Sequence, residues 1–597
     1  MLNHASLFLL DANLKAPLRH SRILNVYKRF KTDKFCFPPY LCSMNSMTKE
    51  ILVSGYDHLL QFPISSLNDF QTWLQNRATF ESQVEEESGW RYIKTTTHTN
   101  DEQAQQAFEE FSTEWYPIIA EKAHELNQKM LQCPFIEQLS EPGFHRYLHD
   151  VKKQVQLFRE ENIPLETELR LLGNEYGNIM GTLEIEHQGK SLTLQQAAKL
   201  LKENDRALRE SIYRKIGAAR LEKRDQLNHL LSKMIQLRHQ MALNAGFPNY
   251  LEYKFVELGR TDYSPADCLQ FHQAVEQAIV PINRTFAQLR KEQLQVENLR
   301  PWDLKVDPLG RAPLSPFQTA AELIEKSKNL FQRLDPSMAE WLKTMEEHQR
   351  LDLESRAHKA PGGYQYPLPH SGIPFIFMNA TGTMADLSTM VHEMGHAVHT
   401  QLANSLSTLY QNPPMEVAEL ASMSMELVTM DLWDEFFGAE ELLRAKEDQL
   451  QDAIGMLPWI AQVDAFQHWL YINPNHTSEE RENHWQSLNE RFGTGMVDFT
   501  GFEILQKIAW QGQLHIYEVP FYYIEYGFAQ LGAIALWRNF LGNPTQCLEN
   551  YKKALALGNT ESIPNVYETA GISFNFSPEY LKELASFVSQ EFQKIQA

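Results

Sequence analysis

Apolar residues recur at helical spacing through most of this chain, and the pattern predicts a mostly helical protein. From Ser65 to about Leu269 the sequence contains long amphipathic stretches with few helix-breaking residues, for example Asp101 to Leu131 and Thr193 to Ala245. The segment Gly246 to Asn249 ends the second stretch with a Gly-then-Pro stop signal. Charges at helical spacing in these stretches are typical of a solvated face, so we expect a helical lobe here and not a reaction centre.

The pattern changes between Pro361 and Thr383, where Gly and Pro are frequent and aromatic or β-branched residues form short runs. Such runs predict two small strands. Helical patterning returns after Thr383, which together with Asp386 forms a start similar to a capping box, and it continues to the C-terminus. The expected fold class is therefore mostly α with a small β-sheet.

Length and composition exclude several classes of protein. The 597 residues, 43% hydrophobic and 22% charged, are those of a large globular protein and not of a disordered or collagen-like chain. The net charge of −21 argues against a dedicated binder of nucleic acids or of anionic membranes. Five scattered cysteines indicate neither a disulfide framework nor a cysteine zinc site. We expect a cytoplasmic protein without nucleic-acid or membrane partners; a monomer is compatible with the sequence, which leaves the oligomeric state open.

The first 46 residues differ from the rest, because seven Lys or Arg against two Asp give them a charge of +5. A basic, acid-poor N-terminus is compatible with organellar targeting. The Pro38-Pro39 pair and the lack of a clean amphipathic period favour a disordered tail, or an extension upstream of a translation start at Met47. We thus expect a basic head over 1–46, an N-terminal helical lobe over 47–195 and a catalytic domain over 196–597.

The candidate chemistry lies in the string His392-Glu393-Met394-Gly395-His396. On a helix, residues four apart differ by about 40° of rotation, so both imidazoles project toward one metal. Glu393 lies about 100° round the helix, where a general base can take a proton from water beside that metal. The helix is otherwise apolar, so these side chains interrupt a stripe in which unpaired polar groups are costly. Gly395 costs about 1 kcal/mol of helix propensity, which predicts that another backbone or a substrate comes close.

Catalytic zinc takes three protein ligands and keeps one open position, and Glu419 is the predicted third ligand. It lies 23 residues beyond His396 in a helix expected to begin at Met415, and small neighbours would let this helix pack tightly on the first. Glu416 is the alternative ligand, on a different face of the same helix. Glu426, two turns beyond Glu419, is expected to accept the other N–H of a ligand histidine.

The strings HEMGHAVH and EVAELASMSMEL resemble the oligoendopeptidase F branch of the thimet oligopeptidase metallopeptidase family. The resemblance extends to PFIFMNATGT and LRHQMALNAGFPNYLEY and covers most of 190–590. It implies that His392, His396 and Glu419 bind one Zn²⁺ per chain, on a zincin-type HExxH helix, and that Glu393 is the base. It also implies two helical lobes that enclose a deep channel, which admits short unstructured oligopeptides.

Residues 515–526 read HIYEVPFYYIEY. Aromatic residues at helical spacing often form core, but phenols packed beside a histidine need hydrogen-bond partners when buried. Hydrolysis of a peptide also needs donors aimed at the oxyanion. The family resemblance places Tyr522 and Tyr526 over the zinc together with His515, and Tyr517 is the alternative for the place of His515.

Contacts to the substrate backbone are expected beside the zinc helix. The strand from Pro374 to Thr383 is expected to offer an open sheet edge, to which an extended peptide adds as a further strand. Gly362, Gly363 and Gly382 would permit the backbone of that peptide to approach closely.

These features predict a zinc metalloendopeptidase that hydrolyses internal bonds of short peptides. An alternative is a zinc carboxypeptidase or dipeptidase on a related scaffold, which would release single residues or pairs from the C-terminus. A third hypothesis is a non-catalytic helical scaffold that binds peptides, against which the intact set of ligands and base argues.

Overall fold

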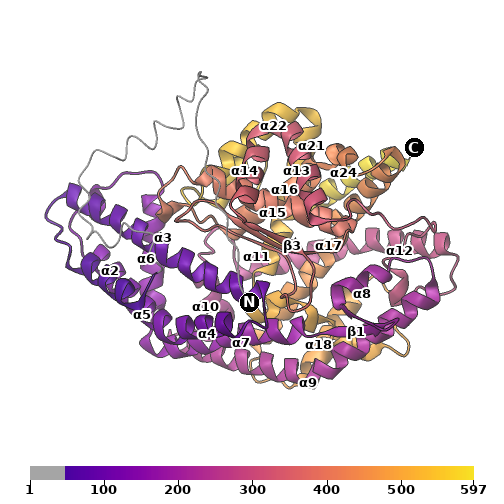
Figure 1. Ribbon diagram of the computed structural model, residues 1–597, viewed down its shortest axis with the longest axis horizontal. Coiled ribbons are helices and arrows are strands. Elements are labelled where there is room, and N and C mark those ends of the chain that lie inside the picture. The colour runs from indigo at the N-terminus through magenta and orange to yellow at the C-terminus, as the bar shows by residue number, and fades with distance from the viewer. Residues whose placement is uncertain (1–46, 597) are drawn as a thin grey trace, which may run out of the picture. The chain divides into compact units, whose positions relative to one another are not determined.

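The computed structural model describes residues 47–596, which are mostly helical with two small β-sheets (Figure 1). The expected fold class, mostly α with a small sheet, is confirmed. The basic head predicted over 1–46 lies outside the described residues. From residue 52 onward the chain packs as one structural unit.

The first part of the described chain forms helices joined by short turns. Its α-helices are α2 (Lys49–Gln61), α3 (Leu67–Thr97), α4 (Glu102–Glu110), α5 (Tyr116–Leu131), α6 (Phe144–Leu157) and α7 (Ile163–Gly181). The stretch predicted as helical from Asp101 to Leu131 is confirmed, because Asp101 caps α4 and one π-helical turn, Phe111–Trp115, joins α4 to α5.

The helix predicted from Thr193 to Ala245 is interrupted and begins differently from the prediction. Residues up to Thr193 belong to an antiparallel hairpin of β1 (Glu184–His187) and β2 (Lys190–Thr193). Thr193 then caps the short helix α8 (Leu194–Leu200), and α9 (Arg206–Asn244) follows after a break. Strands of four residues are too short to show a clear alternation, so the sequence pattern does not reveal them.

The helices after α9 complete this part of the chain. They are α10 (Tyr250–Glu257), α11 (Pro265–Ala278), α12 (Val280–Leu294), α13 (Ala320–Leu334) and α14 (Pro336–Glu347). The predicted stop signal is confirmed: Gly246 has a φ of +85°, a conformation that favours glycine, and α9 ends two residues before it.

The second sheet has three strands in the order β3 (Leu351–Glu354), β5 (Phe375–Ala380), β4 (Tyr364–Tyr366). The two strands predicted between Pro361 and Thr383 are therefore confirmed, and β3 was not predicted. The predicted open edge is wrong, because β5 is the central strand, parallel to β3 and antiparallel to β4. The free edges of this sheet belong to β3 and β4.

The remaining chain is again helical. Its helices are α15 (Met384–Ala403), α16 (Met415–Val428), α17 (Ala439–Ile472), α18 (Ser478–Phe492), α19 (Glu503–Lys507), α20 (Leu514–Glu518), α21 (Tyr523–Gly542), α22 (Pro544–Leu555), α23 (Ile563–Thr569) and α24 (Pro578–Gln596). The predicted capping box at the start of α15 is confirmed, since Asp386 Oδ2 accepts a hydrogen bond from the Thr383 N–H at 2.7 Å.

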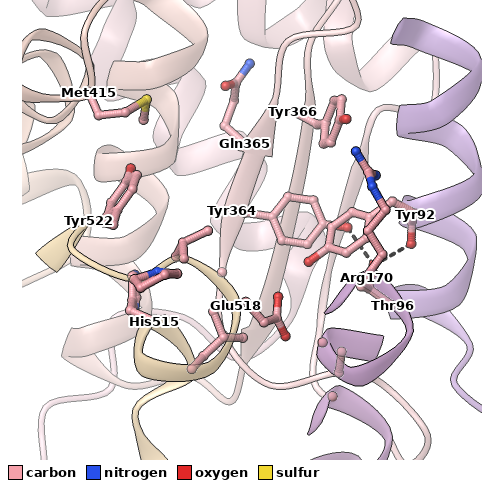
Figure 2. Close-up of a pocket in the computed structure, with 18 of the residues that line it drawn as sticks. Tyr92, Thr96, Arg170, Tyr364, Gln365, Tyr366, Met415, His515, Glu518 and Tyr522 are labelled. Atoms are coloured by element: carbon pink, nitrogen blue, oxygen red, sulfur yellow. Dashed lines mark hydrogen bonds between the residues drawn. The ribbon is translucent and has the colours of Figure 1, made fainter. Parts of the chain in front are cut away.

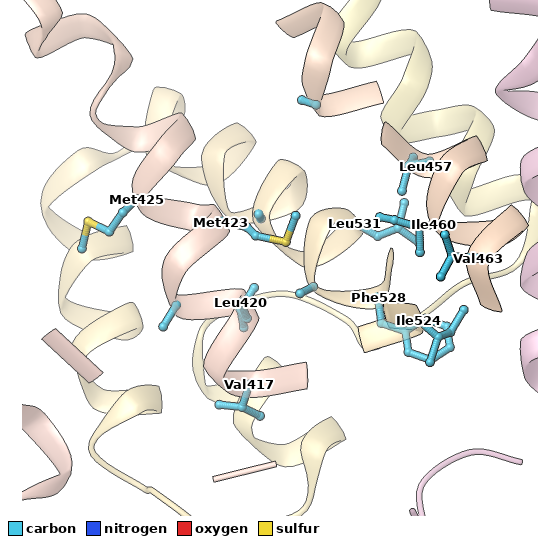
Figure 3. Close-up of a cluster of buried hydrophobic side chains, with 14 of the residues drawn as sticks. Val417, Leu420, Met423, Met425, Leu457, Ile460, Val463, Ile524, Phe528 and Leu531 are labelled. Carbon is cyan, nitrogen blue, oxygen red and sulfur yellow. The ribbon is translucent and has the colours of Figure 1, made fainter. Parts of the chain in front are cut away.

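Helices α16, α17 and α21 share a buried apolar core (Figure 3). Its side chains are buried to 2% exposure or less, among them Val417 and Leu420 from α16, Ile460 from α17, and Ile524 and Phe528 from α21. Nearly all residues of α21 from Ile524 to Trp537 are buried, as expected of a helix enclosed by others. This core fixes α16 and α21 against each other. Within residues 47–596, no helix combines the length and the apolar character that a membrane span requires.

Candidate active site

Helices α15 and α16 approach each other closely at Gly395. A Cβ on Gly395 would lie 2.5 Å from Ser422 Cα and 2.8 Å from the Ala421 carbonyl oxygen, so only glycine fits without a shift. The prediction that another backbone comes close to Gly395 is confirmed. This contact brings the second helix against the face that carries the two histidines.

The close packing brings three potential metal ligands together. One ligating atom each from His392, His396 and Glu419 lies within 4.8 Å of the others. Glu419 Oε2 is 3.4 Å from His392 Nε2 and 3.6 Å from His396 Nε2. Two imidazole nitrogens and one carboxylate oxygen form a known donor set for catalytic zinc. The residues therefore fit a zinc ion, with the open side facing a pocket.

Glu416, the alternative ligand, lies elsewhere. Its carboxylate accepts a hydrogen bond from Tyr263 Oη at 2.5 Å and lies 4.0 Å from Arg260 Nε. These buried partners hold Glu416 on another face of α16, so Glu419 is the only one of the two placed among the histidines.

Glu426 accepts a hydrogen bond from the imidazole nitrogen of His392 that faces away from the potential metal site. The two are 2.7 Å apart, so His392 Nδ1–H donates to Glu426 Oε1 and leaves Nε2 free to ligate. Glu426 Oε2 accepts further hydrogen bonds from Ser388 Oγ and Gln449 Nε2. The structure thus brings Glu426 to the place that its spacing from Glu419 predicts.

Two of the three potential ligands, Glu419 and His396, are in the protonation state that binds a metal. Burial alone would raise the pKa of Glu419, but His396 and His392 outweigh that effect and hold it at about 2. Burial lowers the pKa of His396 to about 4. Glu419 is therefore ionised and His396 neutral near pH 7, as ligation requires. His392 differs, because Glu419 and Glu426 raise its pKa well above the usual value for histidine despite burial, so ligation by His392 would release a proton.

Glu393 lies beside this set of ligands with a free carboxylate oxygen. The side chain is 5% exposed, and its Oε2 has no hydrogen-bond partner among the described residues. Burial raises the pKa of Glu393 to about 8, with a further contribution from Glu419. An unpaired buried carboxylate with a pKa near neutrality matches the requirement for a general base.

His515 belongs to a hydrogen-bond chain that the sequence does not reveal. Trp459 Nε1–H donates to Gln513 Oε1 at 3.1 Å, which orients the amide, and Gln513 Nε2–H donates to His515 Nδ1 at 2.7 Å. The proton of neutral His515 then sits on Nε2, which lies 3.2 Å from Tyr526 Oη. Because Tyr526 accepts there, its own O–H is free to donate to a ligand.

Tyr522 faces the metal ligands directly. Its Oη donates to Glu419 Oε1. The residue before it, Phe521, has a φ of +67°, a strained conformation for a non-glycine residue. Gln467 Oε1 accepts the Phe521 N–H at 2.6 Å, and Arg260 Nη2 donates to its carbonyl at 2.5 Å. Both backbone groups of this turn are therefore held by side chains, which fixes the direction of Tyr522.

Tyr517 does not occupy the site. It is fully buried, stacks on Tyr176 with ring centroids 4.2 Å apart, and donates to the Leu227 carbonyl. Of the two residues considered for that place, His515 is the one that lines the pocket. Tyr517 is part of the core.

The pocket in front of the metal ligands has a volume of about 1070 Å³. Its lining comes from α3, α7, β4, α15, α16 and α20, and Figure 2 shows residues of α3 and α20 facing each other across it. Small-molecule sites typically occupy roughly 300–1,000 Å³. The pocket is therefore large enough for several residues of a peptide.

The three predicted glycines have different surroundings. Gly362 and Gly363 line the pocket, and a Cβ on Gly363 would lie 3.3 Å from Glu393 Oε1. Gly382 is not among the lining residues: a Cβ there would lie 2.8 Å from the Phe317 carbonyl oxygen. The close approach at Gly382 is thus made by the protein's own backbone.

The site combines two histidines one turn apart on a helix, a glutamate from a second helix and a free carboxylate beside them. This combination is typical of metal-dependent hydrolases. The sequence profile described as peptidase family M3 matches residues 199–586, and that of the peptidase M3 N-terminal domain matches residues 52–158. The chain belongs to peptidase family M3.

Relatives with a curated description support the same family. An oligoendopeptidase F homolog from Mycoplasma pneumoniae is 24% identical over 421 residues, which cover 64% of this chain and 66% of that protein. Among solved structures, PZ peptidase A with an inhibitor is 26% identical with a TM-score of 0.88, covering 93% of this chain and 99% of the other. A putative oligoendopeptidase F is 24% identical with the same TM-score, covering 92% and 98%, and shares the fold. The resemblance noted in the sequence is thereby confirmed.

Proposed function

We propose that this protein is a zinc-dependent endopeptidase that cuts internal bonds of short, unstructured peptides. The observation that carries the proposal is the convergence of His392, His396 and Glu419 beside the unpaired carboxylate of Glu393. The names of the relatives, oligoendopeptidase F and PZ peptidase A, agree with this class of reaction.

His392, His396 and Glu419 would hold the zinc ion, one per chain. When bound, zinc supplies a Lewis acid that polarises the scissile carbonyl and acidifies water. Glu393 accepts a proton from the attacking water and then delivers it to the leaving amine, so that it returns to its ionised state. The free O–H of Tyr526 donates to the oxyanion as the carbonyl oxygen gains charge. Tyr522 contributes a second donor if its hydroxyl turns from Glu419 toward the substrate.

The substrate chain is proposed to bind along β4. Tyr364, Gln365 and Tyr366 of this strand line the pocket, and the strand has a free edge because β5 pairs on its other side. An extended peptide can add to such an edge through backbone hydrogen bonds. Gly362 and Gly363 lie directly before this strand and keep side chains out of the approach to Glu393.

A channel between an N-terminal and a catalytic lobe would restrict the substrate to unstructured peptides. In support, the pocket is lined both by α3 and α7 and by α15, α16 and α20, so residues far apart in sequence enclose it. We place the boundary between the lobes near residue 195, between the two matched family profiles. A cytoplasmic location is proposed from the buried Cys133, Cys268 and Cys547, which form no disulfide within residues 47–596 and so suit a reducing compartment.

The test is digestion of a defined peptide mixture read by mass spectrometry. We expect internal cleavage, loss of turnover with 1,10-phenanthroline, and loss of turnover in Glu393→Gln with zinc still bound. Release of only single residues or pairs from the C-terminus would support a carboxypeptidase or dipeptidase instead. Full activity in Glu393→Gln would refute the mechanism, and purified protein that takes up no zinc would support a non-catalytic scaffold.

A further inference from the structure

Glu518 places a carboxylate in the pocket at a position that the proposed mechanism does not use. It is the last residue of α20, one helical turn after His515, so the two side chains share a face. Figure 2 shows the Glu518 carboxylate extending into the pocket, between His515 and the rings of Tyr92 and Tyr364. It therefore lies in the same pocket as the groups assigned to the reaction.

Glu518 has no hydrogen bond and no ion pair with any residue in 47–596, unlike two other acidic residues of the same pocket. Glu166 accepts a hydrogen bond from Tyr116 Oη at 2.5 Å, and Glu257 pairs with Lys254. A partly buried carboxylate without a partner is costly, so its retention in a binding pocket indicates a partner that arrives from outside.

The walls around Glu518 also suit a cation. The side-chain stem lies against Gly173, where a Cβ would be 3.6 Å from Glu518 Cγ. Tyr92, which lines the same pocket, is close enough for the charge of Glu518 to raise its pKa further, beyond the effect of burial. Tyrosine faces beside a carboxylate attract ammonium groups through their negative π-surface as well as through the charge.

The arginine side chains near Glu518 interact with other groups. Arg238, the cation whose charge acts on Glu518, donates to Tyr471 Oη at 2.8 Å and to the Tyr517 carbonyl. Arg170 stacks over the ring of Tyr116 at 3.8 Å. Neither guanidinium contacts the carboxylate. Burial raises the pKa of Glu518 to about 8, because the charge of Arg238 offsets only part of the loss of water.

We propose that Glu518 is the anionic part of a subsite that binds an ammonium group of the peptide substrate next to the bond that is cut. The ammonium belongs either to a lysine side chain or to the free N-terminus of the peptide, and the chemistry of recognition is the same for both. The inference rests on the proposed peptidase function and adds a substrate preference to it.

The test compares matched fluorogenic peptides with blocked ends, in which one position carries lysine or the neutral isostere norleucine, scanned on both sides of the cleaved bond. A further arm carries a free N-terminal amine. We expect the wild type to favour an ammonium at one position, or at the free terminus, by about 10- to 100-fold in kcat/KM, the range for a hydrogen bond to a charged group.

Glu518→Gln should lower that ratio to about one, and Glu518→Asp should restore part of it. Glu175→Gln, which removes a charge from an exposed position of α7 outside the pocket lining, serves as the matched control and should keep the ratio. No ammonium preference in the wild type, or an unchanged preference in a folded Glu518→Gln protein, would overturn the subsite alone. Failure to cut any peptide, charged or neutral, would overturn the proposed function itself.

Discussion

Gly395→Ala tests whether the contact between α15 and α16 sets the geometry of the metal ligands. The added Cβ would meet Ser422 Cα at 2.5 Å, roughly 1 Å inside the optimal separation of about 3.5–4.0 Å between carbon atoms. The atoms met are backbone, so a side-chain rotation cannot relieve the clash and one helix must move. His392 and His396 lie on one of these helices and Glu419 on the other, so the movement separates the ligands.

The expected magnitudes follow from this displacement. Overpacking costs about 1–3 kcal/mol, partly offset by the roughly 1 kcal/mol that alanine gains over glycine in a helix. The modest net loss of stability is therefore accompanied by a larger functional loss: a misplacement of about 1 Å can lower kcat/KM by about 10²-fold. Zinc affinity should fall as well, because the Glu419 carboxylate no longer reaches the position between the two imidazoles.

The assay combines zinc titration, kcat/KM on a blocked peptide and the midpoint of thermal unfolding. Gly455→Ala is the matched control, since Gly455 also lies inside a helix but a Cβ there would meet nothing within 4 Å. The control should gain up to about 1 kcal/mol of stability with unchanged kcat/KM. Wild-type zinc affinity and wild-type kcat/KM in Gly395→Ala would refute the reasoning.

Three further predictions concern the side chains around the centre. Gln513→Glu replaces the donor to His515 Nδ1 by an acceptor, so the ring proton moves to Nδ1 and the Tyr526 O–H turns toward Nε2. Tyr526 then no longer donates to the oxyanion, and kcat should fall by about 10²-fold with little change in KM. An unchanged kcat would contradict the role assigned to Tyr526. Glu426→Ala should weaken zinc binding by about 10- to 100-fold, measured by competition with a chelator, and equal affinity would contradict its supporting role. Because the pKa of Glu518 is raised to about 8, its negative charge grows from pH 6 to pH 9, whereas a lysine ammonium stays protonated over that range. The ratio of kcat/KM for lysine peptides to kcat/KM for norleucine peptides should therefore rise from pH 6 to pH 9 in the wild type. The same ratio should stay constant in Glu518→Gln.

Much of the centre could be predicted because its parts are local. The helical period places His392 and His396 on one face, and the capping box starts that helix at the right residue. Both depend only on spacing within one helix. The Gly395 prediction also succeeded, because a residue that weakens a helix requires a compensating reason.

Other predictions failed because they depended on partners distant in sequence. The strand from Pro374 was expected at a sheet edge, yet β3, a four-residue strand with no clear pattern, pairs with it and makes it central. Gly382 was expected near the substrate, but Phe317, 65 residues earlier, approaches it. Trp459 and Gln513 are 54 residues apart, so nothing local could link them to His515.

The sequence by itself determined the helical class and the helix that carries the two histidines and the candidate base, since these follow from residue types at a fixed helical period. The tertiary structure decided which glutamate joins the histidines. Glu416 and Glu419 are both available on α16, and only the packing of that helix against Gly395, with Tyr263 and Arg260 beside Glu416, separates their roles. It also placed Glu518 in the pocket without a partner among residues 47–596, because the environment of a charged side chain depends on every element that surrounds it.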